Sequence, residues 1–235
     1  MLQDLTPDVD LSPDISHLVI EDDSPVDNLI SEKQMRLLTE PLYSNPAALP
    51  TLKFLVSANV GVFYALKQPP LVPDVFLSLD VEVPQDWREK KNRTYLVWEF
   101  GKSPDVVIEI VSNREGNELG SKLNDYARMG VGYYAVYDPF QQLGTTPLRA
   151  FERRGTHYQE MADFWFEAAG IGLTLWDGEF EGKSDQWLRW CTQAGQIIPT
   201  GFERAEQERE RAEQAEAKAA RLAEQLRSLG VDPNA

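Results

Sequence analysis

The sequence contains little cysteine, little histidine and no long apolar run. Its 235 residues include a single cysteine, Cys191, and two histidines. A disulfide framework and a thiol–imidazole zinc site are therefore both excluded. No stretch approaches the roughly 20 apolar residues that span a bilayer, and residues 1–14 lack the basic and apolar regions of a signal peptide. We therefore expect a cytoplasmic protein.

Positive charge is also scarce, but the deficit is uneven along the chain. The net charge is −15, and residues 1–27 carry eight acidic and no basic side chains. Residues 28–200 carry 22 acidic and 17 basic side chains, so the body of the chain is only mildly acidic. The overall charge therefore does not exclude a nucleic-acid partner, because a local basic groove depends on distribution rather than on the sum.

Composition divides the chain into three regions. Residues 1–27 mix Asp, Pro and Ser without apolar periodicity, which predicts an acidic, flexible arm. Residues 28–200 have the length and apolar content of one domain with its own core. Residues 201–235 change abruptly to Ala, Glu, Gln and Arg, and this composition predicts a charged helix.

Within the middle region, apolar spacing predicts alternating helices and strands. A first helix is expected from about residues 27–31 to the Glu40–Pro41 junction or shortly after it. A second is expected from Asn117, as N-cap, to Met129, with Gly130 as its stop. Runs rich in β-branched and aromatic residues predict strands in four segments, at 51–66, 71–80, 106–111 and 131–139.

Three further segments complete the expected domain. Residues 81–102 are expected to form a polar insertion, residues 148–180 short aromatic strands, and residues 183–195 a further helix. The order of elements predicts a mixed α/β domain in which helices pack on a central sheet.

The C-terminal region has a heptad-like pattern over about four heptads. Its seam, spaced by three and four residues, consists of Ala205, Ala212, Ala215, Ala219, Leu222, Leu226 and Leu229, with Glu208 at one position. This pattern is typical of a coiled coil, and Gly230 would end it. Because alanine buries little surface, we expect a weak homodimer, and a solvated single helix fits the same pattern.

One residue interrupts an otherwise apolar strand. Glu109 stands between Val106–Ile108 and Ile110–Val111, and a carboxylate there costs several kcal/mol unless it is paired or metal-bound. Asp74 lies at a second predicted strand, so the two carboxylates converge if the strands are neighbours. Mg²⁺ suits such a pair, because it accepts one or two carboxylates and fills its other positions with water and phosphate.

The helix that follows supplies a cation for the same place. Lys122 borders the apolar stripe formed by Leu119, Leu123 and Tyr126, and its ammonium can reach back to Glu109. Two carboxylates, a metal and a lysine are the parts that phosphodiester hydrolysis requires. Two structural alternatives stay open: Asp74 as the cap of a turn, and Glu109 as the ion-pair partner of Lys122 without a metal.

Four stretches carry a resemblance to a known family. They are EKQMRLLTE at 32–40, VPDV at 72–75, PDVVIEIVS at 104–112 and KLNDYARMGVGYYAVYDP at 122–139. Over about residues 28–139 the chain resembles the Uma-two family of restriction endonucleases, a branch of the PD-(D/E)xK nuclease superfamily. A charged, coiled C-terminal segment also recurs in such proteins.

The resemblance implies a fold and a set of site residues. It implies a restriction-endonuclease-like αβββαβ core, with Asp74 and Glu109 as the two acids of the motif. Val111 stands where the plain motif has lysine, so the resemblance implies that the lysine has moved to the next helix, as Lys122. Glu40 stands where the superfamily occasionally places an accessory acid.

The sequence therefore predicts a Mg²⁺- or Mn²⁺-dependent endonuclease acting on DNA. The candidate phosphate contacts are basic residues of the insertion and near the site: Arg88, Lys90, Lys91, Arg93, Lys102 and Arg114. A solvated loop explains the first four equally well. The rival interpretation is an inactive nuclease-fold scaffold whose coiled helix recruits a partner or a second copy. A retaining glycosidase also needs two carboxylates, but nothing else in the chain resembles one.

Overall fold

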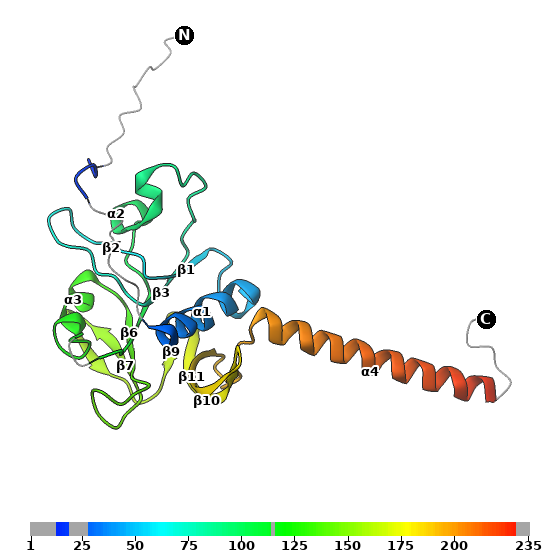
Figure 1. Cartoon of the computed structure of the whole chain (residues 1–235). Coiled ribbons are helices and arrows are strands. Elements are labelled where there is room, and N and C mark those ends of the chain that lie inside the picture. Colours follow the sequence, from blue (N-terminus) through cyan, green and yellow to red (C-terminus); the bar gives the residue numbers. More distant parts are fainter. Residues whose placement is uncertain (1–12, 19–27, 114–115, 229–235) are drawn as a thin grey trace, which may run out of the picture.

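The computed structural model describes residues 13–18, 28–113 and 116–228. Figure 1 shows a body built on a sheet, with one long helix leaving it. The central sheet has six strands in the order β1-β3-β5-β6-β7-β8. Their bounds are β1 Phe54–Ala58, β3 Val75–Leu79, β5 Val106–Ile110, β6 Tyr133–Tyr137, β7 Leu148–Arg154 and β8 His157–Glu160.

The direction of these strands makes the sheet mixed. β1 pairs antiparallel with β3, and β3 pairs antiparallel with β5. β5 and β6 are parallel, and the helix α3 (Ser121–Met129) connects them. Together with α1 (Leu29–Ser44), these elements confirm the predicted αβββαβ core.

The first helix ends at Ser44, three residues past Pro41 and within the expected range. Asn28 caps α1 with its side chain, and Pro41 lies inside the last turn. The face of α1 toward the sheet is apolar, and Met35, Leu38 and Leu42 are buried there with the strands. Burial of this face keeps the last turn helical despite the proline, because packing overrides local propensity.

The second helix is shorter than its sequence predicts. Asn117 has a positive φ of 55°, which differs from the extended backbone of a helix N-cap. It is therefore not the N-cap that the sequence predicts. A turn over residues 118–120 follows, and the Asn117 carbonyl accepts from Gly120 N at 2.9 Å. The helix then begins at Ser121. At its other end Gly130, with φ of 99°, ends the helix as expected.

The expected helix at residues 183–195 is wrong. The segment forms β11 (Lys183–Cys191), which pairs antiparallel with β10 (Ile171–Phe180) along its whole length. Glu181 and Gly182 connect the two strands, and both have positive φ, as a two-residue hairpin turn requires. The aromatic spacing of this segment therefore belongs to a strand rather than to a helix.

A small second sheet and α1 cover one face of the central sheet. This sheet has the order β11-β10-β9, with β9 at Trp165–Phe166. Gln34 of α1 pairs with the backbone of the edge strand β11: its side chain donates to the Leu188 carbonyl at 2.8 Å and accepts from Leu188 N at 2.9 Å. Trp190 Nε1 donates to the Leu38 carbonyl at 2.7 Å. The apolar side chains between these layers form one core cluster.

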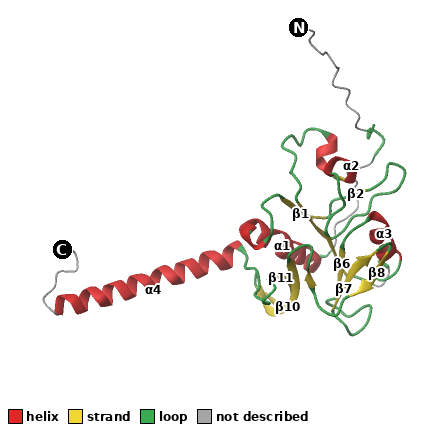
Figure 2. Cartoon of the chain, turned by 180° about the vertical axis from the view of Figure 1, so that it is seen from behind, coloured by secondary structure: helices red, strands yellow, loops and turns green. Residues whose placement is uncertain are grey.

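The other face is covered by α3 and by the insertion. Figure 2 shows α3 beside β6 and β8 and the insertion with α2 (Val97–Phe100) above the sheet. The insertion is less polar than predicted, because β4 (Tyr95–Leu96) is buried and pairs in parallel with β2 (Val62–Phe63). Two short 3₁₀ turns, Pro46–Ala48 and Lys90–Arg93, complete the elements of the body.

The described residues near the two ends of the chain differ in their contacts with the body. Leu18 packs against Phe63 and Leu96, and Lys90 Nζ donates to the carbonyls of Ser16 and Leu18. The rest of the predicted arm lies outside the described residues. The long helix α4 (Gly201–Ser228) forms as predicted and extends away from the body, with none of its residues buried (Figure 1). Leu229 and Gly230 lie outside the described part.

No helix within the described ranges is long and apolar enough to cross a membrane.

Candidate active site

Glu109 lies on β5 on the face that α3 covers. Its neighbours on that face, Val107 and Val111, belong to the apolar cluster under α3, and Glu109 itself is only 1% exposed. Two side chains of α3 reach it. Lys122 Nζ lies 2.8 Å from Glu109 Oε2, and Tyr126 Oη donates to Glu109 Oε1 at 2.5 Å. The interruption of the apolar strand is thus compensated by one ammonium and one hydroxyl.

Asp74 precedes β3, directly next to β5. The pairing of Val75 with Ile108, continued by one residue, sets Asp74 opposite Glu109. Its Oδ2 accepts from Ile110 N at 2.6 Å, so the carboxylate is tied to the backbone beside Glu109. The side chain is partly exposed. Of the two acids predicted from the sequence, Glu109 therefore lies on β5 and Asp74 lies directly before the adjacent strand β3.

The geometry of α3 explains why Lys122 and Tyr126 act together. They are four residues apart, so they share one face of the helix, and that face lies against β5 and β6. Tyr126 is buried and packs against Tyr134 of β6 with the rings tilted by 35° and their centroids 5.2 Å apart. The side chain of Lys122 is 32% exposed, so it lies at the boundary between the cluster and solvent.

Sequence analysis missed two residues of this site. Tyr126 was assigned only to the apolar stripe, although its spacing from Lys122 indicates the contact. Glu118 was not considered at all, and it lies four residues before Lys122. It is 5% exposed, and its Oε1 lies 3.5 Å from Lys122 Nζ. Its Oε2 is buried and has no hydrogen-bond partner among the residues that the structure describes.

Asp74, Glu109, Glu118, Lys122 and Tyr126 form a charged cluster, and burial dominates its electrostatics. It raises the pKa of the Glu109 carboxyl above its usual range, and Lys122 and Tyr126 oppose that rise without cancelling it. Burial alone would lower the pKa of Lys122, but attraction to Glu109 outweighs it and the pKa of the ammonium is raised. Burial also raises the pKa of Tyr126 well above its usual value, so the hydroxyl keeps its proton and donates.

The cluster contains more acidic than basic side chains. Glu109, Glu118 and Asp74 all act on Lys122, so three carboxyl groups lie near one ammonium. Asp74 and Glu109 are the side chains that could hold a divalent cation. The described residues contain no group of three or more His, Cys, Asp or Glu with the spacing of a metal site, so water would have to complete the shell, as Mg²⁺ commonly requires.

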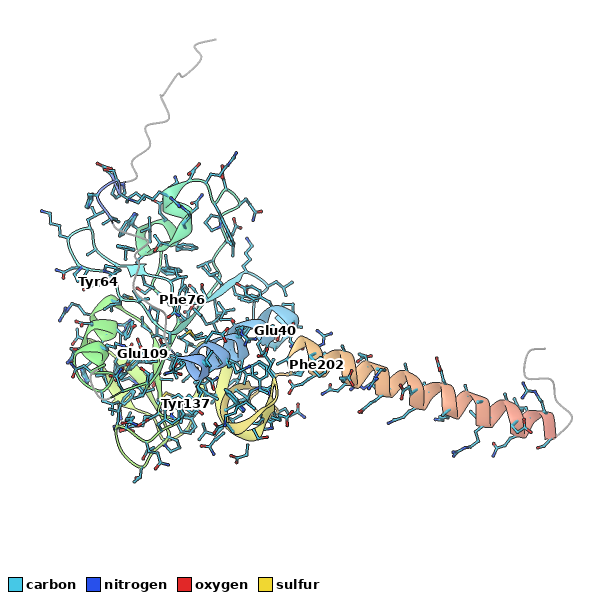
Figure 3. The ribbon with its side chains drawn as sticks, viewed as in Figure 1. Glu40, Tyr64, Phe76, Glu109, Tyr137 and Phe202 are labelled. Atoms are coloured by element: carbon cyan, nitrogen blue, oxygen red, sulfur yellow. The ribbon has the colours of Figure 1, made fainter. Side chains whose placement is uncertain are left out.

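Glu40, the candidate accessory acid, lies elsewhere. Its carboxylate accepts from Gly201 N at 3.0 Å and from the Ser44 hydroxyl, at the start of α4. The helix that carries it packs on the opposite face of the sheet from Glu109. Figure 3 shows the two residues well apart. The structure therefore does not bring Glu40 into the cluster.

Lys102 does not lie beside the pair of acids, contrary to expectation. Its Nζ contacts both oxygens of Asp105 at 2.7 and 2.8 Å. Asp105 precedes β5 and lies four residue steps before Glu109, a distance of about 13 Å along the strand. Lys102 thus belongs to the opposite end of the strand. Arg114 lies outside the described residues.

The remaining basic candidates lie in the insertion. Arg88 pairs with Asp86 at 2.8 Å and its side chain is 91% exposed. Lys91 lies 3.7 Å from Glu89. Lys90 holds the backbone of residues 16–18. Arg93 lines an apolar groove of about 390 Å³ together with Trp87 and Tyr95.

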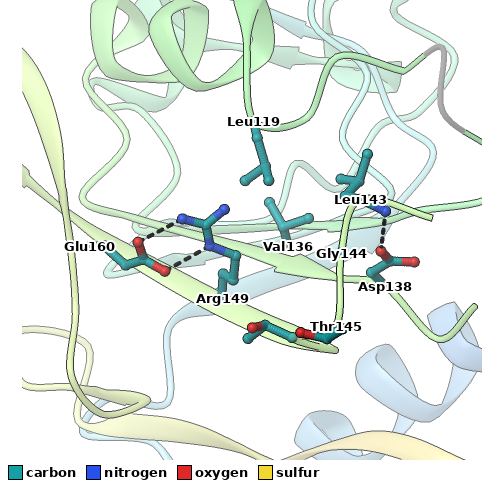
Figure 4. Close-up of a pocket in the computed structure, with 9 residues that line it drawn as sticks. Leu119, Val136, Asp138, Leu143, Gly144, Thr145, Arg149 and Glu160 are labelled. Atoms are coloured by element: carbon teal, nitrogen blue, oxygen red, sulfur yellow. Dashed lines mark hydrogen bonds and ion pairs between the residues drawn. The ribbon is translucent and has the colours of Figure 1, made fainter. Parts of the chain in front are cut away.

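A small cavity adjoins the cluster on β6. It has a volume of about 180 Å³ and is lined by Leu119 and Val136, the latter paired with Glu109 in the sheet. Figure 4 shows Arg149 held by Glu160 on one side and Asp138 bonded to Leu143 N on the other. Asp138 also accepts from Gln142 N at 2.8 Å, so its carboxylate holds the turn that follows β6.

Comparison with known proteins agrees with the sequence motifs. Residues 19–167 match the model of the Uma2 family, whose description is "Putative restriction endonuclease". The match includes α1, the central strands and the cluster around Glu109. A search of curated proteins finds no match. Because the family model covers well over half of the sequence, the chain belongs to the Uma2 family.

Proposed function

We propose that the protein is an endonuclease that hydrolyses phosphodiester bonds of DNA with a divalent cation, Mg²⁺ or Mn²⁺. Membership of the family indicates a nuclease and a DNA substrate. The finer proposal assigns the cation to Asp74 and Glu109, and the cationic contact with the substrate to Lys122.

The observation that carries the proposal is the environment of Glu109. A buried carboxyl group with a raised pKa lies opposite Asp74, in a cluster of three carboxyl groups and one ammonium. A purely structural ion pair would place one carboxylate against one ammonium. Three carboxylates around Lys122 leave room in the charge balance for a divalent cation.

The chemistry of the site follows from the roles of its side chains. A bound cation would lower the pKa of a coordinated water and neutralise charge on the substrate phosphate. Tyr126 fixes one oxygen of Glu109 by donating to it at 2.5 Å, so the carboxylate keeps one orientation. The side chain of Lys122 is partly exposed, and its ammonium can donate to a phosphate oxygen as negative charge develops on it.

Contacts with the DNA backbone are proposed for Arg88, Lys91 and Arg93 of the insertion. The ion pairs of Arg88 and Lys91 are exposed, and such pairs contribute little to stability. They can therefore exchange an intramolecular carboxylate for a DNA phosphate at small cost. Lys90 and Lys102 are engaged inside the body and are weaker candidates.

We also propose that α4 mediates weak homodimerisation. The helix is 28 residues long and no described residue of it is buried. Leu222 and Leu226 of the seam are exposed in the single chain, at 49% and 38%. A second copy would cover them.

A crystal soaked in Mn²⁺ tests the nuclease proposal directly. We expect anomalous density between Asp74 and Glu109, and Mn²⁺-dependent cleavage of plasmid DNA by the same preparation. Lys122→Ala should retain the density and lose on the order of 10²- to 10³-fold in cleavage, as when one stabiliser of a charged transition state is removed. If no anomalous density appears between Asp74 and Glu109 and the plasmid DNA stays uncut, the result would instead support the inactive scaffold.

A further inference from the structure

The ammonium of Lys122 has two carboxylate neighbours, and only one belongs to the proposed cation site. Glu109 Oε2 lies 2.8 Å away and Glu118 Oε1 lies 3.5 Å away. Glu118 is nearly as buried as Glu109, with 6% of its side chain exposed. Its Oε2 has no hydrogen-bond partner among the residues in the described ranges. Since an unpartnered buried carboxylate oxygen is costly, this placement calls for an explanation.

Glu118 is held in position by its surroundings. Tyr134 Oη of β6 donates to the Glu118 backbone carbonyl at 2.9 Å. The absence of a side chain at Gly116 leaves space for the carboxylate, because a Cβ there would lie 1.8 Å from Glu118 Oε1. The carboxylate therefore points toward Lys122 rather than toward solvent.

A cation bound to Glu109 Oε2 would compete with Lys122 for the same oxygen. Glu109 Oε1 already accepts from Tyr126, and Oε2 accepts from Lys122. If Oε2 is engaged by another positive group, the ammonium loses its nearest counter-charge. Lysine has three N–H donors on a flexible stem, so a second carboxylate at 3.5 Å can take over at the cost of a small movement.

We propose that Glu118 is a positioning residue for Lys122: it is the second counter-charge, which keeps the ammonium at the site when the Glu109 carboxylate is engaged elsewhere. The inference rests on the proposed function for its catalytic meaning. Its structural content, that Glu118 holds Lys122 once Glu109 no longer does, is testable without any substrate or metal.

The first test uses NMR of the lysine ammonium groups, in which hydrogen-bonded NH₃⁺ exchanges slowly enough to be seen. The Lys122 signal is assigned by its loss in Lys122→Arg. In metal-free protein, Glu109→Gln should retain the signal, because Glu118 still holds the ammonium. Glu109→Gln combined with Glu118→Gln should lose it, through at least a roughly tenfold faster exchange. Retention of the signal in the double variant overturns the proposal.

Two variants separate position from charge. Gly116→Ala keeps every charge but displaces the Glu118 carboxylate, so in the Glu109→Gln background it should lose the signal as the double variant does. Glu206→Gln on α4, which removes an exposed carboxylate paired with Arg209, is the matched control and should change nothing. Loss of the Lys122 signal in Glu109→Gln alone would also contradict the proposal, since Glu118 would then be unable to hold the lysine.

A second test addresses the cation-loaded protein. At saturating Mg²⁺, wild-type protein should keep a shifted Lys122 signal, and Glu118→Gln should lose it. Affinity for Mn²⁺ should change less than about threefold in Glu118→Gln, whereas cleavage should fall on the order of tenfold or more. A fall in Mn²⁺ affinity as large as that of Glu109→Gln would make Glu118 a ligand and overturn the positioning role.

The two proposals fail differently. If Mg²⁺ leaves the wild-type spectrum unchanged and no DNA is cut, the proposed function fails. The metal-free comparison of Glu109→Gln with the double variant still decides whether Glu118 holds Lys122.

Discussion

The two faces of the central sheet differ in chemistry although they share every strand. Ile108 and Glu109 are consecutive residues of β5, and both are almost fully buried. Ile108 points into a layer of apolar side chains from α1 and the small sheet. Glu109 points into the layer under α3, where Lys122 and Tyr126 contact it.

This difference separates two tasks of one strand. The α1 face binds the chain together through apolar burial, and a few backbone-directed hydrogen bonds such as those of Gln34 satisfy its polar groups. The α3 face accepts a buried charge cluster that a purely stabilising core would avoid. Substitutions at neighbouring residues of β5 should therefore have separate consequences.

The largest effect is expected at Glu109. Glu109→Gln keeps the size of the side chain but removes the charge proposed to hold the cation, so cleavage of DNA should fall on the order of 10⁴-fold. Single-turnover cleavage at saturating Mn²⁺ measures this effect. Asp74→Asn should behave alike. Wild-type cleavage by either variant would remove the distinction between the two faces.

The next effect is expected at Ile108, on the other face. Ile108→Ala removes a fully buried side chain and should lower the free energy of unfolding by about 3 kcal/mol, because a cavity remains in a packed layer. Urea denaturation measures it. Mn²⁺ affinity of the folded protein should change less than about threefold. A large loss of affinity would show that the faces are coupled.

A smaller effect concerns pH and the metal-free protein. Because the folded-state pKa of Glu109 is raised, its contribution to stability is present below the unfolded pKa and is lost as pH rises through the folded pKa. Glu109→Gln should therefore become more stable relative to wild type as pH rises from about 4.5 toward neutrality. Melting temperatures in EDTA across this range test it. A drop in the melting temperature of the variant at neutral pH would favour a structural ion pair over the catalytic role.

The smallest effect on the body is expected from shortening α4. Deleting residues 208–235 leaves the contacts at the base of the helix, including Arg189 with Glu203 at 2.7 Å and Glu40 with Gly201. The free energy of unfolding should change by less than about 0.5 kcal/mol, and sedimentation should show a shift from dimer toward monomer. An unchanged mass would show that the helix is not the dimer contact.

Much of the site could be predicted from the sequence because its signals are local. Period-two alternation places Glu109 on one strand face, and the spacing of four residues places Tyr126 with Lys122. The wrong prediction of a helix at 183–195 also has a local cause. The hairpin turn before it consists of only two residues, Glu181 and Gly182, and the aromatic residues that follow do not reveal the positive φ values of this turn. Lys102 was misplaced because it is close to Glu109 in sequence, whereas the extended strand β5 places the two residues at opposite ends.

The sequence by itself determined the order of helices and strands in the αβββαβ core and indicated Asp74, Glu109 and Lys122 as candidate site residues, since each follows from periodicity and from the cost of burying a charge. Only the tertiary structure decided which groups compensate Glu109, that Glu40 caps α4 on the other face, and that Glu118 turns inward to Lys122. These outcomes depend on contacts between elements that lie apart in the chain. Pairing of β3 with β5 and packing of α3 set those contacts, and no local pattern specifies them.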